Sequence, residues 1–245
     1  MRGKTHCAIG VLSVIQASIL FKIPVSILNL ILSAFFSILP DLDESNSVIS
    51  DFFLKKNVSK FILKITIYTI NLAIFFISLK LNDNFYISSI ITFLSIMVIE
   101  SKLTHILLRK IFLSLIFILL GICLYLAKIK IYFVLLFLML SVFPWLKHRS
   151  FSHSIFAVFI IYFLLKQIEL LYSISNLAFF GTTSYSSHIF LGDLFTKSGI
   201  PIFYPLSDKK YSLGFFKVGS LFSNMLEISF ILLLVGSIIL SIIKI

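Results

Sequence analysis

Long apolar runs fill almost the whole chain, and short polar segments separate them. Runs of about 16 to 20 apolar residues are long enough to cross the hydrocarbon core of a bilayer as helices. Of the 245 residues, 59% are hydrophobic and only 13% are charged, whereas soluble domains have about 25% charged residues. Such a chain cannot cover a water-facing surface. The sequence therefore predicts a polytopic membrane protein and excludes a soluble globular one.

The apolar runs predict an all-α fold, a helical bundle of about nine transmembrane helices in a single membrane domain covering residues 1–245. We expect the amino-terminal run to be a span and not a secretory signal peptide, because no small-residue cleavage site follows it. Several runs are short for a hydrocarbon core of about 30 Å, so one or two could be re-entrant. The predicted spans lie near residues 5–21, 24–39, 61–79, 85–99, 111–127, 131–146, 152–166, 172–196 and 225–243.

The distribution of basic residues predicts the orientation of the chain. The formal net charge is +11, from 21 Lys and Arg against 10 Asp and Glu. If the spans alternate, fourteen of the bases fall on one side of the membrane and six on the other. Basic loops stay on the cytoplasmic side of the plasma (inner) membrane, so we expect the amino terminus inside and the carboxyl terminus outside. Bases at an anionic leaflet favour membrane lipids as partners and disfavour nucleic acid.

Four polar segments interrupt the apolar pattern: Thr5-His6, PDLD (40–43), HRSFSHS (148–154) and SHIFLGDLFT (187–196). The alternating topology places all four at the cytoplasmic ends of spans. Ionisable groups at membrane depth are costly unless they pair, reach water or hold an ion, so they indicate a functional site. Nitrogen and oxygen ligands without a thiolate cluster suit Zn²⁺ or Mn²⁺. The candidate metal ligands are His6, Asp41, Asp43, His148, His153, His188 and Asp193.

Local sequence indicates how these side chains could approach one ion. The proline of PDLD tends to end a helix, so its two aspartates are expected on a turn where both carboxylates can face one metal. His148 and His153 bracket a turn and a helix start. Arg149 carries a guanidinium whose geometry suits an anionic oxygen, particularly phosphate. The same side chain could also serve only as an anchor to lipid phosphates.

These four segments, in this order, resemble the YdjM family of predicted membrane-bound metal-dependent hydrolases. The resemblance covers roughly residues 1–50 and 144–206. It implies a metal site made of the seven candidate ligands, and a more distant similarity to the zinc-dependent phospholipase C and P1 nuclease class implies phosphoester hydrolysis. The chain departs from the family pattern in three places. These are Glu44 after PDLD, inserted helices in 51–143 that we expect to be peripheral to the site, and four residues instead of three before the last aspartate.

The favoured hypothesis is a metal-dependent hydrolase whose substrate is a small-molecule or lipid phosphoester at the cytoplasmic leaflet. Asp41 or Asp43 would accept a proton or bridge two ions, and Arg149 would stabilise developing negative charge. The alternative is a divalent-metal transporter or channel with the same ligands, although transporters tend to place ligands near the midplane, often in repeated halves. A noncatalytic protein with a structural metal is a third hypothesis that the sequence leaves open.

The spacing of the last motif predicts a distorted helix. Five steps of about 100° leave His188 and Asp193 about 140° apart in a regular helix, so one metal could not bind both. A π-turn absorbs one extra residue, and Gly192 is a point where a helix loosens. We therefore expect the helix to widen or break between His188 and Asp193. The competing hypothesis is that Asp193 points elsewhere and caps the turn with Thr196.

Overall fold

The structure is a computed structural model that describes residues 3–243, and this range is helical throughout its regular elements, with no strand. Residues 1–2 and 244–245, and with them the predicted placement of the two termini, lie outside the described residues. The α-helices are α1 (Gly3–Phe21), α2 (Ile27–Ile38), α3 (Val48–Phe53), α4 (Lys56–Asn82), α5 (Phe85–Lys102), α6 (His105–Leu126), α7 (Ile131–Val142), α8 (Ile155–Tyr172), α9 (Leu177–Ser187) and α10 (Leu221–Ile243). The 3₁₀ turns are η1 (Leu39–Asp43), η2 (Phe143–Trp145), η3 (Phe151–His153) and η5 (Asp193–Phe195), and η4 (His188–Gly192) is a π-helix.

Six helices in the described part of the chain are long and apolar enough to cross a membrane, namely α1, α4, α5, α6, α8 and α10. The protein is therefore a multi-pass membrane protein, but the predicted count of nine spans is not supported. The other three apolar runs hold α2, α7 and α9, which have only 12, 12 and 11 residues. Pro40 and Pro144 start 3₁₀ turns that end the α-helical geometry of two of these runs.

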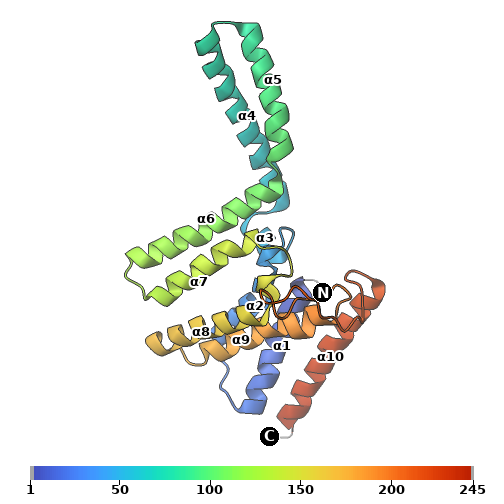
Figure 1. Cartoon of the computed structure of the whole chain (residues 1–245). Coiled ribbons are helices and arrows are strands. Elements are labelled where there is room, and N and C mark those ends of the chain that lie inside the picture. The colour runs from blue at the N-terminus through green and yellow to red at the C-terminus, as the bar shows by residue number, and fades with distance from the viewer. Residues whose placement is uncertain (1–2, 244–245) are drawn as a thin grey trace.

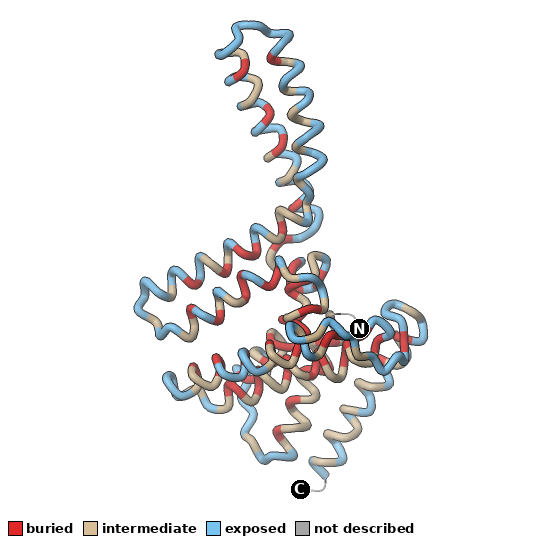
Figure 2. The backbone as a smooth tube through the Cα atoms, in the orientation of Figure 1, coloured by how far each residue is buried: buried red, intermediate tan, exposed pale blue. Residues whose placement is uncertain are grey.

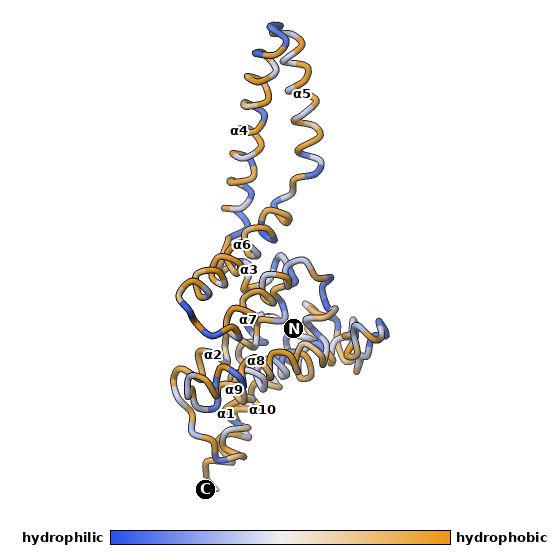
Figure 3. The backbone as a smooth tube through the Cα atoms, turned by 60° about the vertical axis from the view of Figure 1, so that its left-hand side comes forward, coloured by the Kyte–Doolittle hydropathy of each residue, from blue (hydrophilic) through white to orange (hydrophobic). Residues whose placement is uncertain are grey.

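The helices form a compact group with one hairpin extending from it (Figure 1). Helices α1, α2, α8, α9 and α10 pack around one another, and the α6–α7 hairpin contacts α8 through α7. The α4–α5 hairpin projects away from the rest and is exposed along most of its length (Figure 2). Figure 3 shows that the residues of this hairpin are largely apolar, with hydrophilic residues at the tip, and many of the apolar side chains are exposed. Such a surface is suited to contact with lipid.

Small residues allow the helices around the site to pack closely. A Cβ on Gly10 of α1 would lie 2.3 Å from Ser37 Cβ of α2, and a Cβ on Gly181 of α9 would lie 2.4 Å from Leu165 Cδ1 of α8. Close backbone approach through small residues is typical of membrane helix pairs. Gly10 lies one turn after His6, so this contact holds the start of α1 against the end of α2.

Polar side chains join α10 to α1. Thr5 Oγ1 donates a hydrogen bond of 2.6 Å to Glu227, and Gln16 Nε2 donates one of 3.0 Å to Ser241 Oγ. Glu227 is buried, and its other oxygen accepts a hydrogen bond from Ser223. Interhelical hydrogen bonds of this kind stabilise helix pairs in membranes. They fix α10 beside the amino-terminal turn that carries His6.

Candidate metal centre

The seven predicted ligands come from separate segments of the chain and meet at one end of the compact group. His6 lies in the first turns of α1, and Asp41 and Asp43 lie on η1, which continues α2. The remaining candidates lie on the segment between η2 and α8 and on the distorted continuation of α9; they are His148, His153, His188 and Asp193. Helices α4 to α7 contribute no side chain to the ligand groups found among the described residues. The inserted segment thus lies outside these groups.

Four of the seven side chains form one tight group. Asp41, His153, His188 and Asp193 each offer a ligand atom, and these atoms lie within 4.8 Å of one another. Asp193 Oδ2 lies 3.1 Å from His153 Nε2 and 3.6 Å from His188 Nε2. Asp41 Oδ1 lies 3.5 Å from His188 Nε2 and 3.9 Å from His153 Nε2. Two imidazole nitrogens and two carboxylate oxygens therefore surround one point.

The spacing and chemistry of this group fit a tetrahedral metal. Ligand bonds of 2.0 to 2.1 Å place tetrahedral ligand atoms about 3.3 to 3.4 Å apart, close to the distances of 3.1 to 3.9 Å in this group. His153 Nε2, His188 Nε2 and Asp193 Oδ2 are buried and have no hydrogen-bond partner. Leaving three such atoms unpaired is costly unless an ion satisfies them. The residues present fit a divalent ion such as Zn²⁺.

Hydrogen bonds to the opposite ring nitrogens orient both histidines. His188 Nδ1 donates to the backbone oxygen of Ser37 at 2.7 Å. His153 Nδ1 lies 2.9 Å from Ser152 Oγ, and the Ser152 hydroxyl in turn donates to Asp43 at 2.6 Å. Each ring therefore directs Nε2 toward the centre. Metal-binding histidines usually have this kind of support, which fixes the tautomer and the ring orientation.

Asp43 is the hub of a second group, with His148 and His153. Its carboxylate contacts His148 Nδ1 at 2.7 Å, accepts from the Arg149 backbone N–H at 3.1 Å and lies 3.4 Å from His153 Nδ1. The Asp43 oxygens and His148 Nδ1 are already hydrogen-bonded. Three ligand atoms of the first group (Asp41, His153, His188 and Asp193, below called the tetrahedral group) have no such partner. Asp43 and His148, predicted as direct ligands, thus form with His153 a group that could hold an ion, while in the metal-free site Asp43 supports His153. A metal bound by this second group would have to displace these hydrogen bonds.

Charges within the site shift the pKa values of its groups. Burial alone would raise the pKa of the Asp43 carboxyl, but His153 and the hydrogen bond with His148 lower it to about 2. Burial alone would lower the pKa of His153, but the carboxylates of Asp43 and Asp193 raise it to about 10. Without metal, a proton on His153 balances these carboxylates. A metal that binds Nε2 must therefore displace that proton.

Arg149 binds one of the candidate ligands directly. Its Nη2 donates to Asp193 Oδ1 at 2.8 Å, and its Nη1 donates to Thr196 Oγ1 at 3.0 Å. The backbone of Arg149 has φ of +59°, a left-handed conformation that is uncommon for a residue with a side chain. The guanidinium thus holds Asp193 so that Oδ2 faces the histidines. This contact with a ligand is a role beyond the two predicted for Arg149, the stabilisation of developing charge on a substrate and the binding of lipid phosphate.

The predicted distortion between His188 and Asp193 is confirmed. Residues His188–Gly192 form a π-helix, and Asp193 begins a 3₁₀ turn. The wide turn absorbs the extra residue, so both side chains reach the same point. Thr196 does cap this turn through the Asp193 backbone oxygen, but the Asp193 carboxylate still faces the centre.

His6 lies beside the tetrahedral group and outside it. Its ring stacks on that of His188 with centroids 3.7 Å apart, and its Nε2 lies 3.9 Å from Asp193 Oδ1. A Cβ on Gly192 would lie 2.3 Å from His6 Cε1, so only glycine leaves room for this ring. His6 is therefore positioned to pack against the centre or to take part in a second ion site next to it.

A polar cavity of about 610 Å³ gives solvent access to the centre. Asp41, His148, Arg149 and Asp193 line it from the site, and Lys210 lines it from the loop before α10. The Asp41 side chain is 16% exposed, whereas those of His153 and His188 are fully enclosed. Asp41 is therefore the member of the tetrahedral group that faces the cavity most openly.

Sequence reasoning did not identify several supporting groups. Ser152, the Ser37 carbonyl and Thr196 orient the histidines and Arg149, and Lys210 and Glu44 line the cavity. Ser152 and Thr196 lie inside the polar motifs, so their hydroxyls were visible as candidates. The Ser37 carbonyl and Lys210 carry no sequence signal, because only the fold brings them to the site.

The fold and this site define a multi-pass membrane protein with a buried His/Asp group that could hold a metal ion. The chain belongs to the YdjM inner membrane protein family, whose family model matches residues 1–244. The match runs through 51–143, so those helices lie within the family match, although the resemblance from sequence covered only the flanking regions. No curated protein and no solved structure shows a significant match to this chain.

Proposed function

We propose that this protein is a metal-dependent hydrolase that cleaves a phosphoester, with its site at the cytoplasmic leaflet. The observation that supports this most is the tetrahedral group, whose three unpaired ligand atoms converge at the base of a polar cavity. Asp41, His153, His188 and Asp193 would hold the ion. A bound divalent ion would polarise the oxygen of the scissile group and, with a water from the cavity as a further ligand beside the protein groups, would activate that water.

The remaining residues of the site prepare the cavity for an anionic substrate. Arg149 and Lys210 both line it, and a phosphate would meet positive charge there. Arg149 also keeps Asp193 aimed at the centre through the 2.8 Å hydrogen bond. Glu44 and His148 line the same cavity and can exchange protons with water or substrate. Asp43 holds His148 and His153 in place.

A phosphoester is the substrate class that this arrangement favours. Carboxylates and imidazoles would hold the ion, while the Arg149 guanidinium, besides its bonds to Asp193 and Thr196, and the Lys210 ammonium line the wall that the substrate's negative charge would meet. The orientation toward the cytoplasmic leaflet is a prediction from the distribution of bases along the sequence, and it requires the short helices α2, α7 and α9 to carry the chain across the membrane as the six long ones do. At that depth, lipid phosphates reach the cavity by lateral diffusion in the membrane.

Metal analysis of purified protein, together with a panel of phosphatase and phospholipase substrates, tests the proposal. We expect about one zinc or manganese ion per chain and metal-dependent phosphate release. Asp41→Asn should greatly reduce both, because it removes the negative charge of the ligand that faces the cavity most openly. Asp83→Asn is the matched control, since Asp83 lies at the hairpin tip with φ of +47°, which asparagine tolerates.

Two outcomes of this experiment, and one of a separate liposome uptake assay, would decide between the hypotheses. Metal that is bound with no hydrolysis on any substrate would contradict the proposal. Uptake of metal into liposomes that Asp41→Asn abolishes would instead support the transporter hypothesis. Equal activity of Asp41→Asn and Asp83→Asn would show that the tetrahedral group is not the catalytic centre.

A further inference from the structure

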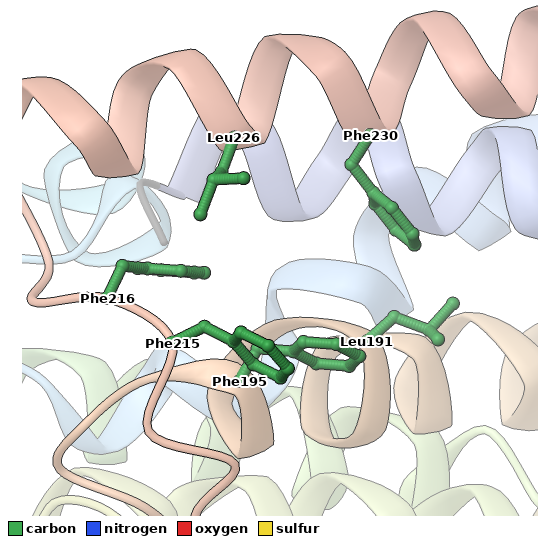
Figure 4. A pocket seen from close by; sticks show the side chains of 6 residues that line it. All are labelled: Leu191, Phe195, Phe215, Phe216, Leu226 and Phe230. Atoms are coloured by element: carbon green, nitrogen blue, oxygen red, sulfur yellow. The ribbon is translucent and has the colours of Figure 1, made fainter.

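An apolar pocket of about 210 Å³ lies between α10 and the segment 188–195, which carries the candidate ligands His188 and Asp193 (Figure 4). Leu226 and Phe230 reach into it from α10, and aromatic side chains face them from the other wall. The mechanism proposed above uses none of these residues. Its complete lining is Leu191, Phe195, Phe215, Phe216, Leu226 and Phe230.

The pocket and the polar cavity share their walls. Leu191 and Phe195 line the pocket, and Asp193, between them in sequence, lines the cavity. Phe216 lines the pocket, and Val218, two residues later, lines the cavity. One segment thus presents a charged face to the candidate centre and an apolar face to the pocket.

Backbone hydrogen bonds join the two segments that form the wall opposite α10. The Phe215 N–H donates to the Phe195 oxygen at 3.1 Å, and the Lys197 N–H donates to the Phe216 oxygen at 2.9 Å. The rings of Phe195 and Phe215 stack with centroids 5.6 Å apart. The distance between the pocket and Asp193 is therefore set by the fold.

The opposite wall belongs to a helix that faces the bilayer. Only 6% of the most apolar 18-residue stretch of α10 is buried, so most of this helix is available to lipid. An apolar ligand can therefore reach the pocket from the membrane. A volume of 210 Å³ holds about seven groups of the size of a water molecule, each near 30 Å³, which is comparable to a short run of methylene groups.

We infer that this pocket receives part of an acyl chain of the substrate, whose phosphate lies in the neighbouring polar cavity. This inference rests on the proposed function and makes the substrate class a phospholipid. Arg149 and Lys210 in the cavity match an anionic head group, and the apolar pocket beside it matches the chain. Since the chain is already in an apolar phase, the pocket would position the lipid more than increase its affinity.

Photolabelling and hydrolysis together test the inference. The probe is a phosphatidic acid with a diazirine on one acyl chain, added to the full-length protein in a nonionic detergent. We expect saturable labelling of the pocket lining that unlabelled phosphatidic acid competes away. Leu226→Trp should abolish the saturable component by filling the pocket, and Phe230→Trp is a second variant with the same expectation.

Ile228→Trp is the matched control. Ile228 lies on α10 two residues from Leu226, is 59% exposed and is not among the residues that line the pocket. This variant should keep the saturable labelling of the wild type. Metal content should be unchanged in all three variants, because none of these residues belongs to the ligand group.

The hydrolysis arm compares one head group with and without its acyl chains, as in dihexanoyl phosphatidic acid and glycerol 3-phosphate. We expect Leu226→Trp to reduce turnover of the acylated substrate only. Equal turnover in wild type and variant, with labelling that does not saturate, would overturn the pocket assignment and leave the hydrolase proposal intact. Saturable labelling without any hydrolysis would support the pocket and overturn the hydrolase proposal.

Discussion

Replacing Asp43 with asparagine separates a supporting carboxylate from a direct metal ligand. Asp43 Oδ2 accepts hydrogen bonds from the Ser152 hydroxyl and the Arg149 N–H, and Oδ1 contacts His148 Nδ1. The asparagine oxygen can take the Oδ2 position and keep two of these bonds. Its amide then faces His148, which is 37% exposed and free to turn. The Asp43→Asn variant therefore keeps the shape of the site but loses one negative charge behind His153.

The magnitude follows from this geometry. Loss of a supporting carboxylate typically costs 10- to 100-fold in metal affinity. His153 keeps its direct partner Ser152 at 2.9 Å, whereas Asp43 lies farther away at 3.4 Å. We therefore expect the lower end, about tenfold or about 1.4 kcal/mol. Asp41→Asn, which alters a ligand of the tetrahedral group, should weaken binding by more than about 100-fold.

Competition with a chromophoric zinc chelator measures both affinity and stoichiometry in detergent. Asp83→Asn again serves as the control and should bind zinc as the wild type does. An Asp43→Asn protein with unchanged affinity would refute the supporting role. Loss of one full equivalent of zinc from a wild-type protein that binds two would show instead that Asp43, His148 and His153 form a second metal site.

Three further predictions follow from the structure. Gly192→Ala places a Cβ against His6 and should lower the free energy of unfolding by about 1 to 3 kcal/mol, the usual cost of overpacking. A fall in the thermal stability of the detergent-solubilised protein would report this loss. Zinc affinity should fall about a hundredfold per unit as the pH is lowered from 8 to 7, because binding displaces the protons held by His153 and His188, whose pKa values of about 10 and about 9 lie above this range. In a variant without native cysteines, a thiol reagent outside the cell should label Asp83→Cys and not Asn57→Cys.

Each of these measurements has a clear contrary result. Unchanged thermal stability of Gly192→Ala would show that the His6 ring does not pack at Gly192. A zinc affinity independent of pH, or calorimetry in two buffers that detects no proton release, would contradict a protonated His153 in the metal-free site. External labelling of Asn57→Cys alone would reverse the proposed orientation.

The sequence was most informative about the membrane character and least informative about helix length. Apolar runs predict buried or lipid-facing helices, but they do not reveal where an α-helix becomes a 3₁₀ turn. At Pro144 the run continues through Trp145 and Leu146 while the geometry changes to a 3₁₀ turn. The segment 173–176 likewise separates α8 from α9 through the left-handed residues Ser173 and Asn176. Only packing selects such local conformations.

The candidate site was predictable where chemistry is unusual for a membrane. All seven ligand candidates stood out as ionisable groups among apolar residues, and the spacing of His188 and Asp193 predicted the π-turn. The division of labour among them was not predictable, because it depends on which oxygen of Asp43 or Asp193 faces which partner. The role of Arg149 also depends on distance, since its 2.8 Å contact with Asp193 joins segments 44 residues apart.

X-ray absorption at the zinc edge of the metal-loaded protein tests the central claim most directly. We expect one zinc ion per chain with four protein nitrogen or oxygen ligands at about 2.0 to 2.1 Å, two of them imidazoles, and at most one water oxygen beside them. His188→Ala should remove one imidazole from this shell. A sulfur ligand, a six-coordinate shell of water oxygens, or a spectrum that is the same in wild type and His188→Ala would contradict the account.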